Sequence, residues 1–167
     1  GTPRWMYSRA VPVLDEDNQI IEWVGTLQDI TERKRTEQLL QESATKFLAI
    51  LEQLPVGVAV LDRRGKFTLR NTIMHQCLGD SMPSLGNDSP TTIQVFDAEG
   101  RVLSPDFWPS PQALRGTSTH GLEACFSYAD GRVEWQLVSA VPVVADDGKV
   151  ASAILVLQNI SKQKKKR

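Results

Sequence analysis

The sequence has few of the residues that metal sites, disulfide frameworks and membrane spans require. Among its 167 residues are two cysteines and two histidines, and Cys77 and Cys125 have neither metal-ligand spacing nor a framework of partners. We therefore expect free thiols and a reducing, cytoplasmic compartment. No apolar run approaches the ~20 residues of a membrane-spanning helix, and the N-terminal residues lack a signal-peptide pattern. These absences predict a soluble fragment without membrane contact, although the parent protein could be membrane-anchored.

Strong net charge and the motifs of catalysis are also lacking. The net charge is −1, and we expect the basic run from Lys162 to Arg167 to be the solvated start of a helix, so no nucleic-acid partner is predicted. There is no glycine-rich phosphate loop, no HExxH motif, no nucleophile beside a recognisable base and no pair of catalytic carboxylates. The fragment is therefore predicted to be non-enzymatic.

What the chain does contain is a repeat. The stretch RAVPV at residues 9–13 recurs as SAVPV at residues 139–143, and the same offset places Trp5 on Trp135 and Gln28 on Gln158 without a gap. Matches in register over about thirty residues indicate a repeated structural unit. The first copy lacks the hundred residues that precede the second, so we interpret it as the C-terminal part of a domain whose body lies outside this sequence.

Both copies of the repeat have the pattern of a β-hairpin. Residues 4–14 and 20–28 are rich in β-branched and aromatic residues around the polar DEDNQ, and residues 133–144 and 149–158 repeat this around ADDG. A lone hairpin is barely stable in water, so we expect the first one to pair with another chain or to dock on the helix that follows.

Residues 31–54 predict one long helix. The segment has no Gly or Pro, begins after Asp29, and stops before Pro55. Its apolar positions alternate in steps of four and three, as in a heptad seam: Leu40, Ala44, Phe47, Leu51 and Leu54. Such a stripe fits either packing on the protein's own sheet or a parallel homodimer, and the pattern leaves both open.

Residues 55–160 have the pattern of an α+β domain. VGVAVLD and KFTLR form a predicted hairpin, and Asn71 and Thr72 can cap a short helix that ends at Gly79. A polar loop (79–90), a further hairpin near 92–103 and a short helix ending at Gly116 follow, before a strand at 121–128 enters the second repeat. We expect about five antiparallel strands with short helices inserted between strands two and three.

Three stretches resemble the PAS sensor family. DITERK (29–34) looks like the junction through which a PAS domain joins the next module, and ILEQLPVGVAVLDRRGKFTLRN (50–71) looks like the entry into a PAS domain. The region from WPSPQALRG (108–116) to residue 150 resembles the second half of PAS domains in bacterial sensor kinases. The resemblance divides the chain into the C-terminal hairpin of an upstream PAS domain (1–30), a helical linker (31–54), a complete PAS domain (55–160) and the start of another linker helix (161–167).

The resemblance implies a sensory module that detects a small molecule or partner and signals through a helix. A sensor histidine kinase is the expected output domain of the same chain; a ligand-free dimerisation scaffold and the regulation of a cyclic-dinucleotide enzyme are the alternatives. The junctions of sheet and helix are the expected signal route: Asp29, Ile30, Thr31, Asn159, Ile160 and Ser161. In the second junction Asn159 replaces the usual Asp, and a neutral cap should hold the corner less firmly than a carboxylate.

A ligand cavity is expected between the sheet and the inserted helices. Its predicted lining comprises Val60, Met74, Cys77, Phe107, Trp108, Arg115, Cys125 and Ser127. The reactive-cysteine motif of flavin photosensors is absent, and no family motif makes His75 or His120 a haem ligand, so we predict no metal and no cofactor, and either an unidentified small organic ligand or none.

Overall fold

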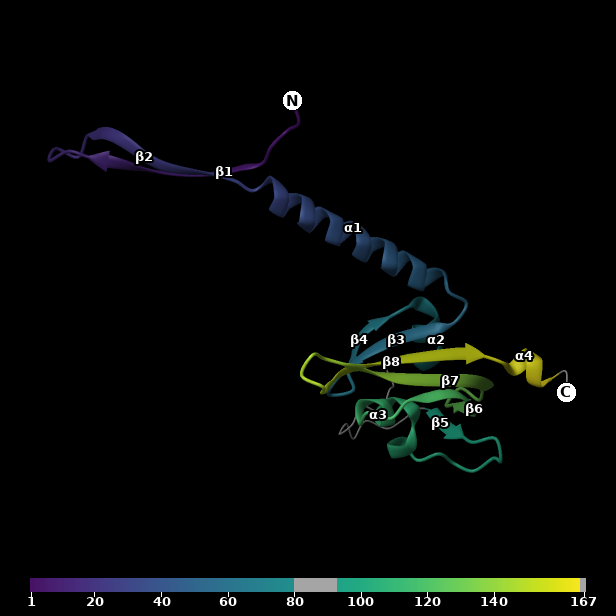
Figure 1. Ribbon diagram of the computed structural model, residues 1–167. Helices are drawn as coiled ribbons and strands as arrows, with labels where there is room; N and C mark the ends of the chain where they lie inside the picture. Colours follow the sequence, from purple (N-terminus) through teal and green to yellow (C-terminus); the bar gives the residue numbers. More distant parts are fainter. Residues whose placement is uncertain (80–92, 166–167) are drawn as a thin grey trace. The chain divides into compact units, whose positions relative to one another are not determined.

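The computed structural model describes residues 1–79 and 93–165, which form two compact units, 1–49 and 50–167 (Figure 1). Each unit is described by itself. The predicted polar loop at 79–90 lies, apart from Gly79, outside the described residues, as does the end of the basic run at 166 and 167.

The first unit contains the predicted hairpin and most of the predicted helix. Strands β1 (Met6–Leu14) and β2 (Ile20–Asp29) pair antiparallel, and α1 (Thr31–Gln53) follows and reaches into the second unit. The turn uses Asn18, whose φ of 61° lies in the left-handed region that Asn tolerates. Nearly every residue of both strands is exposed, so the hairpin does not dock on α1 as one of the two alternatives supposed. Pairing with another chain stays a prediction.

The second unit is a six-stranded antiparallel sheet with short helices. Its strand order is β4-β3-β8-β7-β6-β5. The strands are β3 (Gly57–Asp62), β4 (Phe67–Arg70), β5 (Ile93–Phe96), β6 (Thr119–Tyr128), β7 (Val133–Val144) and β8 (Val150–Asn159). The helices are α2 (Thr72–Leu78), the 3-10 turn η1 (Pro105–Phe107), α3 (Pro109–Leu114) and α4 (Ser161–Lys164).

The predicted α+β PAS-like fold is confirmed, with one strand more than expected. The hairpin predicted near 92–103 contributes only its first half to the sheet, because β5 pairs with β6 while Val102 makes a single bridge to Phe96. Strand β5 is therefore held in the sheet by Cys125–Tyr128, the end of β6, and not by the second half of the predicted hairpin.

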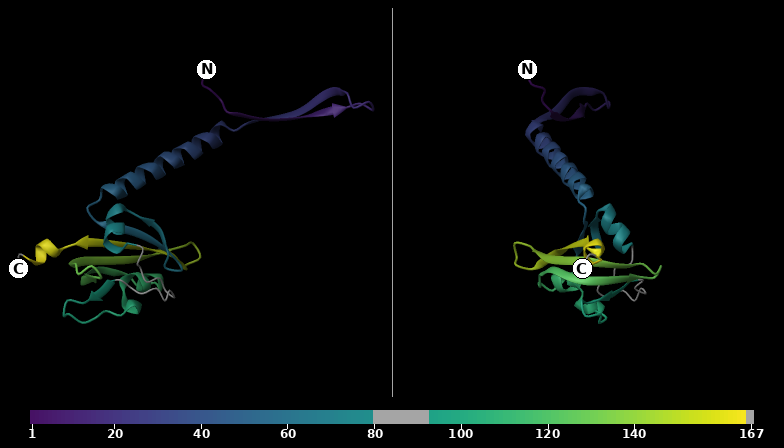
Figure 2. Two further views of the ribbon diagram at one scale, coloured as in Figure 1. Left: turned by 180° about the vertical axis from the view of Figure 1, so that it is seen from behind. Right: turned by 90° about the vertical axis from the view of Figure 1, so that its right-hand side faces the viewer.

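The core lies between the sheet and α2 and α3. Helix α3 packs against β7 and β8, and α2 packs against β3 (Figure 2). Alternate residues of each strand face this layer, since side chains of a strand point to opposite faces in turn. In β6 these are Ala124, Phe126 and Tyr128, and in β8 they are Ala153, Leu155 and Leu157.

Candidate functional site

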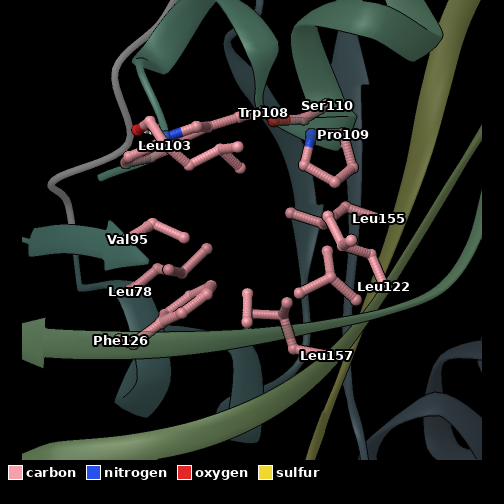
Figure 3. Close-up of a pocket in the computed structure, with 12 residues that line it drawn as sticks. Leu78, Val95, Leu103, Trp108, Pro109, Ser110, Leu122, Phe126, Leu155 and Leu157 are labelled. Carbon is pink, nitrogen blue, oxygen red and sulfur yellow. Dashed lines mark hydrogen bonds between the residues drawn. The ribbon is translucent and has the colours of Figure 1, made fainter. Parts of the chain in front are cut away.

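A small apolar cavity lies in this core. Figure 3 shows Leu78 and Phe126 on one side of it and Leu155 and Leu157 on the other. The indole Nε1 of Trp108 donates to the carbonyl oxygen of Leu103 at 2.9 Å, so this ring contributes only apolar surface to the wall. The complete lining is Leu78, Val95, Leu103, Trp108, Pro109, Ser110, Leu122, Ala124, Phe126, Val138, Leu155 and Leu157.

The cavity has a volume of about 20 Å³. Sites for small organic molecules usually measure about 300–1,000 Å³. This cavity is far smaller and has room for about one water molecule. An organic ligand could therefore enter only if part of the wall moved.

Of the eight predicted lining residues, the structure places Trp108 at this cavity. Val60, Cys125 and Ser127 occupy the alternate strand positions, whose side chains point away from the core, so their assignment was wrong by one residue of strand register. Met74 is fully buried in the core beside the cavity rather than in its wall. Three of the missed residues carried a signal, because Leu122, Ala124 and Phe126 are the apolar residues of β6 at the phase opposite to Cys125 and Ser127.

The remaining three predicted residues lie elsewhere. Phe107 is 64% exposed. The Arg115 Nη1 donates to the carbonyl oxygen of Asp106 at 2.9 Å, a local contact that holds this guanidinium at the surface. Cys77 lines a separate open hollow with Tyr128 and Arg132, where burial and the nearby Glu134 raise the pKa of its thiol. The two histidines are exposed, and the described residues contain no cluster of metal-binding side chains.

The two predicted signal junctions have the same hydrogen bonds. At the first, the backbone N–H of Ile30 donates to the carbonyl oxygen of Trp5 at 2.9 Å, and the N–H of Trp5 donates to the Thr31 hydroxyl at 2.9 Å. At the second, the N–H of Ile160 donates to the carbonyl oxygen of Trp135 at 2.8 Å. The N–H of Trp135 donates to the Ser161 hydroxyl at 2.9 Å. The repeat in sequence is thus a repeat of one strand-to-helix corner.

The residue before each corner caps it with a side-chain oxygen. Asp29 Oδ1 accepts from the N–H of Thr31 at 2.9 Å, and Asn159 Oδ1 accepts from the N–H of Ser161 at 3.0 Å. The hydrogen bonds from Thr31 lower the pKa of Asp29, and Arg4 nearby adds to this effect. The neutral Asn159 makes the same bond without the charge.

This difference predicts the behaviour of Asn159→Asp. The new carboxylate should cap the second corner as Asp29 caps the first, and it should raise the melting temperature by about 2 °C at pH 7. Because its folded-state pKa would lie below the unfolded value, the gain should be present above pH ~4 and be lost as the pH falls through the folded-state pKa. Thermal melts of both proteins from pH 7 to pH 2.5 measure it, and a difference independent of pH would contradict the charge argument.

A third junction joins the end of α1 to the sheet through Asn71. The side chain is 2% exposed and makes four hydrogen bonds. Its Oδ1 accepts from the N–H groups of Val58 (2.9 Å) and Met74 (3.0 Å). Its Nδ2 donates to the carbonyl oxygens of Leu51 (2.9 Å) and Val56 (2.8 Å). One amide therefore ties the last turn of α1, the start of β3 and the start of α2 together.

The apolar stripe of α1 divides into two parts. Leu40 and Phe47 are 72% and 57% exposed, and Ala44 between them is also exposed. Leu51 is buried in the second unit, and Leu54 is half-buried. The end of the stripe thus belongs to the domain, whereas its exposed part has no cover within the described chain.

Comparisons with known proteins match parts of the chain. Residues 1–35 match the family described as PAS fold, which confirms the predicted resemblance for the first corner. The chain is 38% identical over 65 residues to the protein of Sinorhizobium fredii named "Uncharacterized protein y4lL"; these residues are 39% of this chain. The chain spans 8% of the length of that relative.

Two solved PAS domains are among the similar structures. That of an HTR-like protein from Haloarcula marismortui is 22% identical, with 77% of this chain and all of that chain covered, at a TM-score of 0.48. That of nitrogen regulation protein NR(II) from Vibrio parahaemolyticus is 17% identical, with 68% and 96% covered, at a TM-score of 0.46. Among the described residues, no helix combines the length and the apolar character that a membrane crossing needs.

Proposed function

We propose that the second unit is a sensory PAS module that passes a change in its core to helices at its two ends. The observation that carries this proposal is the pair of ties at the ends of the unit: the second corner fixes the first turn of α4 to strand β7, and Asn71 fixes the last turn of α1 to strand β3. A change at a strand end must therefore move the helix attached to it.

Short paths lead from the cavity to both ends of the module. Leu157 lines the cavity and lies on β8 two residues before Asn159, where the second corner begins. At the other end, Leu78 lines the cavity from α2, and the first turn of α2 is tied to the carbonyl oxygen of Leu51 through Asn71. A molecule or partner that altered the core would thus act on α4 through β8 and on α1 through α2.

The output proposed is a histidine kinase domain of the same protein, regulated through a parallel homodimer. A sensor of this kind needs two packings of similar energy, since a ligand shifts an equilibrium only by its differential affinity for the two states. The second candidate function is a ligand-free dimerisation scaffold, and the small size of the cavity favours it.

Coupling between core and corners can be tested by filling the cavity. Ala124 lines it and is 1% exposed, so Ala124→Val adds two methyl groups to a space of about 20 Å³. Crowding of β6 and β8 should change the hydrogen-exchange rates of the Ile160 and Lys164 amides by about threefold or more. Native-state exchange followed by NMR measures these rates.

The control is Ala98→Val, the same change at an exposed turn. We expect it to leave the rates of the Ile160 and Lys164 amides unchanged. If Ala124→Val alters exchange near β6 but has no effect on the Ile160 and Lys164 amides, the proposed route through the second corner is wrong.

A further inference from the structure

One buried polar atom of the core has no partner. Gln136 on β7 is fully buried, and its Oε1 makes no hydrogen bond within the described residues. Its Nε2 donates to Glu134 Oε2 at 3.0 Å. This bond fixes the orientation of the amide, because a carboxylate oxygen can only accept from the NH₂ group. The carbonyl oxygen is therefore left as an unused acceptor in the apolar core, which is rare and costly in folded proteins.

Gln136 has two neighbours that belong to the wall of the apolar cavity. Val138 follows it by two residues on the same face of β7, and Ala124 is its cross-strand partner on β6. Both neighbours line the cavity. Gln136 is thus adjacent to two residues of the apolar wall, although it is not itself one of the residues that line the cavity.

A second hollow lies on the other side of Leu78. It has a volume of about 270 Å³, opens to solvent, and is lined by Cys77, Leu78, Tyr128 and Arg132 among others. Leu78 lines both spaces, so this side chain is a common wall between them. It is the last residue of α2, one position before Gly79, whereas the Asn71 bonds hold the opposite end of that helix. A rotation of Leu78 would join the two spaces without disturbing the start of α2.

The polar groups around Gln136 suit a neutral donor. The Glu134 carboxylate accepts from Gln136 and from the Tyr128 hydroxyl (3.4 Å), and it faces Arg132 at 3.5 Å. Its charge is thus already matched, and a cationic group would have to compete with Arg132. The acceptor without a partner is the neutral carbonyl oxygen of Gln136.

We propose that Gln136 is the recognition group of a ligand site that forms when Leu78 turns aside, and that the ligand is a small apolar molecule carrying one neutral hydroxyl or N–H donor. The apolar body occupies the cavity enlarged toward the hollow, and the donor bonds to Gln136 Oε1. This inference rests on the proposed sensory function and names the class of ligand that the module would detect.

Phenol and toluene are suitable probes because they have similar shapes and differ in one hydroxyl donor. Their dissociation constants are measured by NMR titration of the 167-residue protein, of Leu78→Ala and of Gln136→Met. Leu78→Ala removes the wall and should tighten both probes by a similar factor. Gln136→Met removes the acceptor at similar size and should shift the affinity ratio of phenol to toluene about tenfold against phenol.

The control Gln158→Met makes the same change at an exposed position of β8 and should leave the ratio unchanged. If Leu78→Ala does not fold, Leu78→Val is used in its place, because it removes less of the wall. An unchanged ratio in Gln136→Met overturns the proposal, as does failure of both probes to bind the variant with the opened wall at millimolar concentration. Probe binding that depends on Gln136 supports this site. If that binding leaves the hydrogen-exchange rates of the Ile160 and Lys164 amides unaltered, it counts against the proposed sensory function only.

Discussion

Asn71→Ala should lower the free energy of unfolding of the second unit by about 3–4 kcal/mol, because four hydrogen bonds of about 1 kcal/mol each are lost together. The substitution leaves the N–H groups of Val58 and Met74 and the carbonyl oxygens of Leu51 and Val56 without this partner. Little water can replace the amide, since the side chain is 2% exposed. Urea denaturation followed by tryptophan fluorescence measures the loss.

Asn159→Ala provides the matched control. It makes the same chemical change at an exposed residue whose side chain caps one N–H group, that of Ser161. Its cost should stay at or below about 1 kcal/mol. Equal costs for the two substitutions would show that other groups take over the bonds of Asn71. The conclusion that Asn71 holds α1, β3 and α2 together would then be wrong.

The local structure around Asn71 could be predicted from sequence because short-range chemistry decides it. An Asn followed by Thr and an apolar run indicates a helix start, and the predicted cap is confirmed by the bond between Asn71 Oδ1 and the N–H of Met74. Strand β7 was also predicted with its observed bounds, Val133–Val144, since turn residues mark both ends. The two long-range bonds to Leu51 and Val56 could not be predicted, because they depend on how distant elements meet.

The cavity lining was largely missed for a different reason. Both faces of β7 carry apolar residues, so the pattern alone does not decide whether Leu137 and Val141 or Val138 and Ala140 face the helices. Val138 and Ala140 are buried, and with them the polar Gln136, which a hydrophobicity pattern places at the surface. Its burial is visible only once the strand is paired with β6 and β8.

The stripe of α1 shows the same limit. Phe47 and Leu51 are neighbouring positions of the same heptad seam, yet Phe47 is 57% exposed while Leu51 is buried. The last turn of the helix is held in the second unit by the bond between Asn71 and the carbonyl oxygen of Leu51. A charge at Leu51 would therefore damage the domain, and a test of dimerisation must use the exposed part of the stripe.

Leu40→Glu combined with Phe47→Glu should weaken the proposed parallel homodimer by about 100-fold or more, which corresponds to about 2.7 kcal/mol. In a parallel pair each glutamate would meet its own copy across the seam, and the apolar contact of two large exposed side chains would be lost. Neither residue is buried within its own chain, so the fold of the second unit should be retained. Sedimentation equilibrium from about 1 to 200 µM gives the dissociation constants, and circular dichroism confirms the fold.

Gln38→Glu combined with Thr45→Glu is the matched control. It introduces two glutamates on the same helix at exposed positions outside the stripe, so the dimer should persist with a dissociation constant changed by less than about threefold. Equal weakening by both pairs would assign the effect to net charge instead of the seam. A native protein that stays monomeric at 200 µM, or a dimer that the stripe variant leaves intact, would exclude the seam, and the exposed stripe would then have to be covered by another partner.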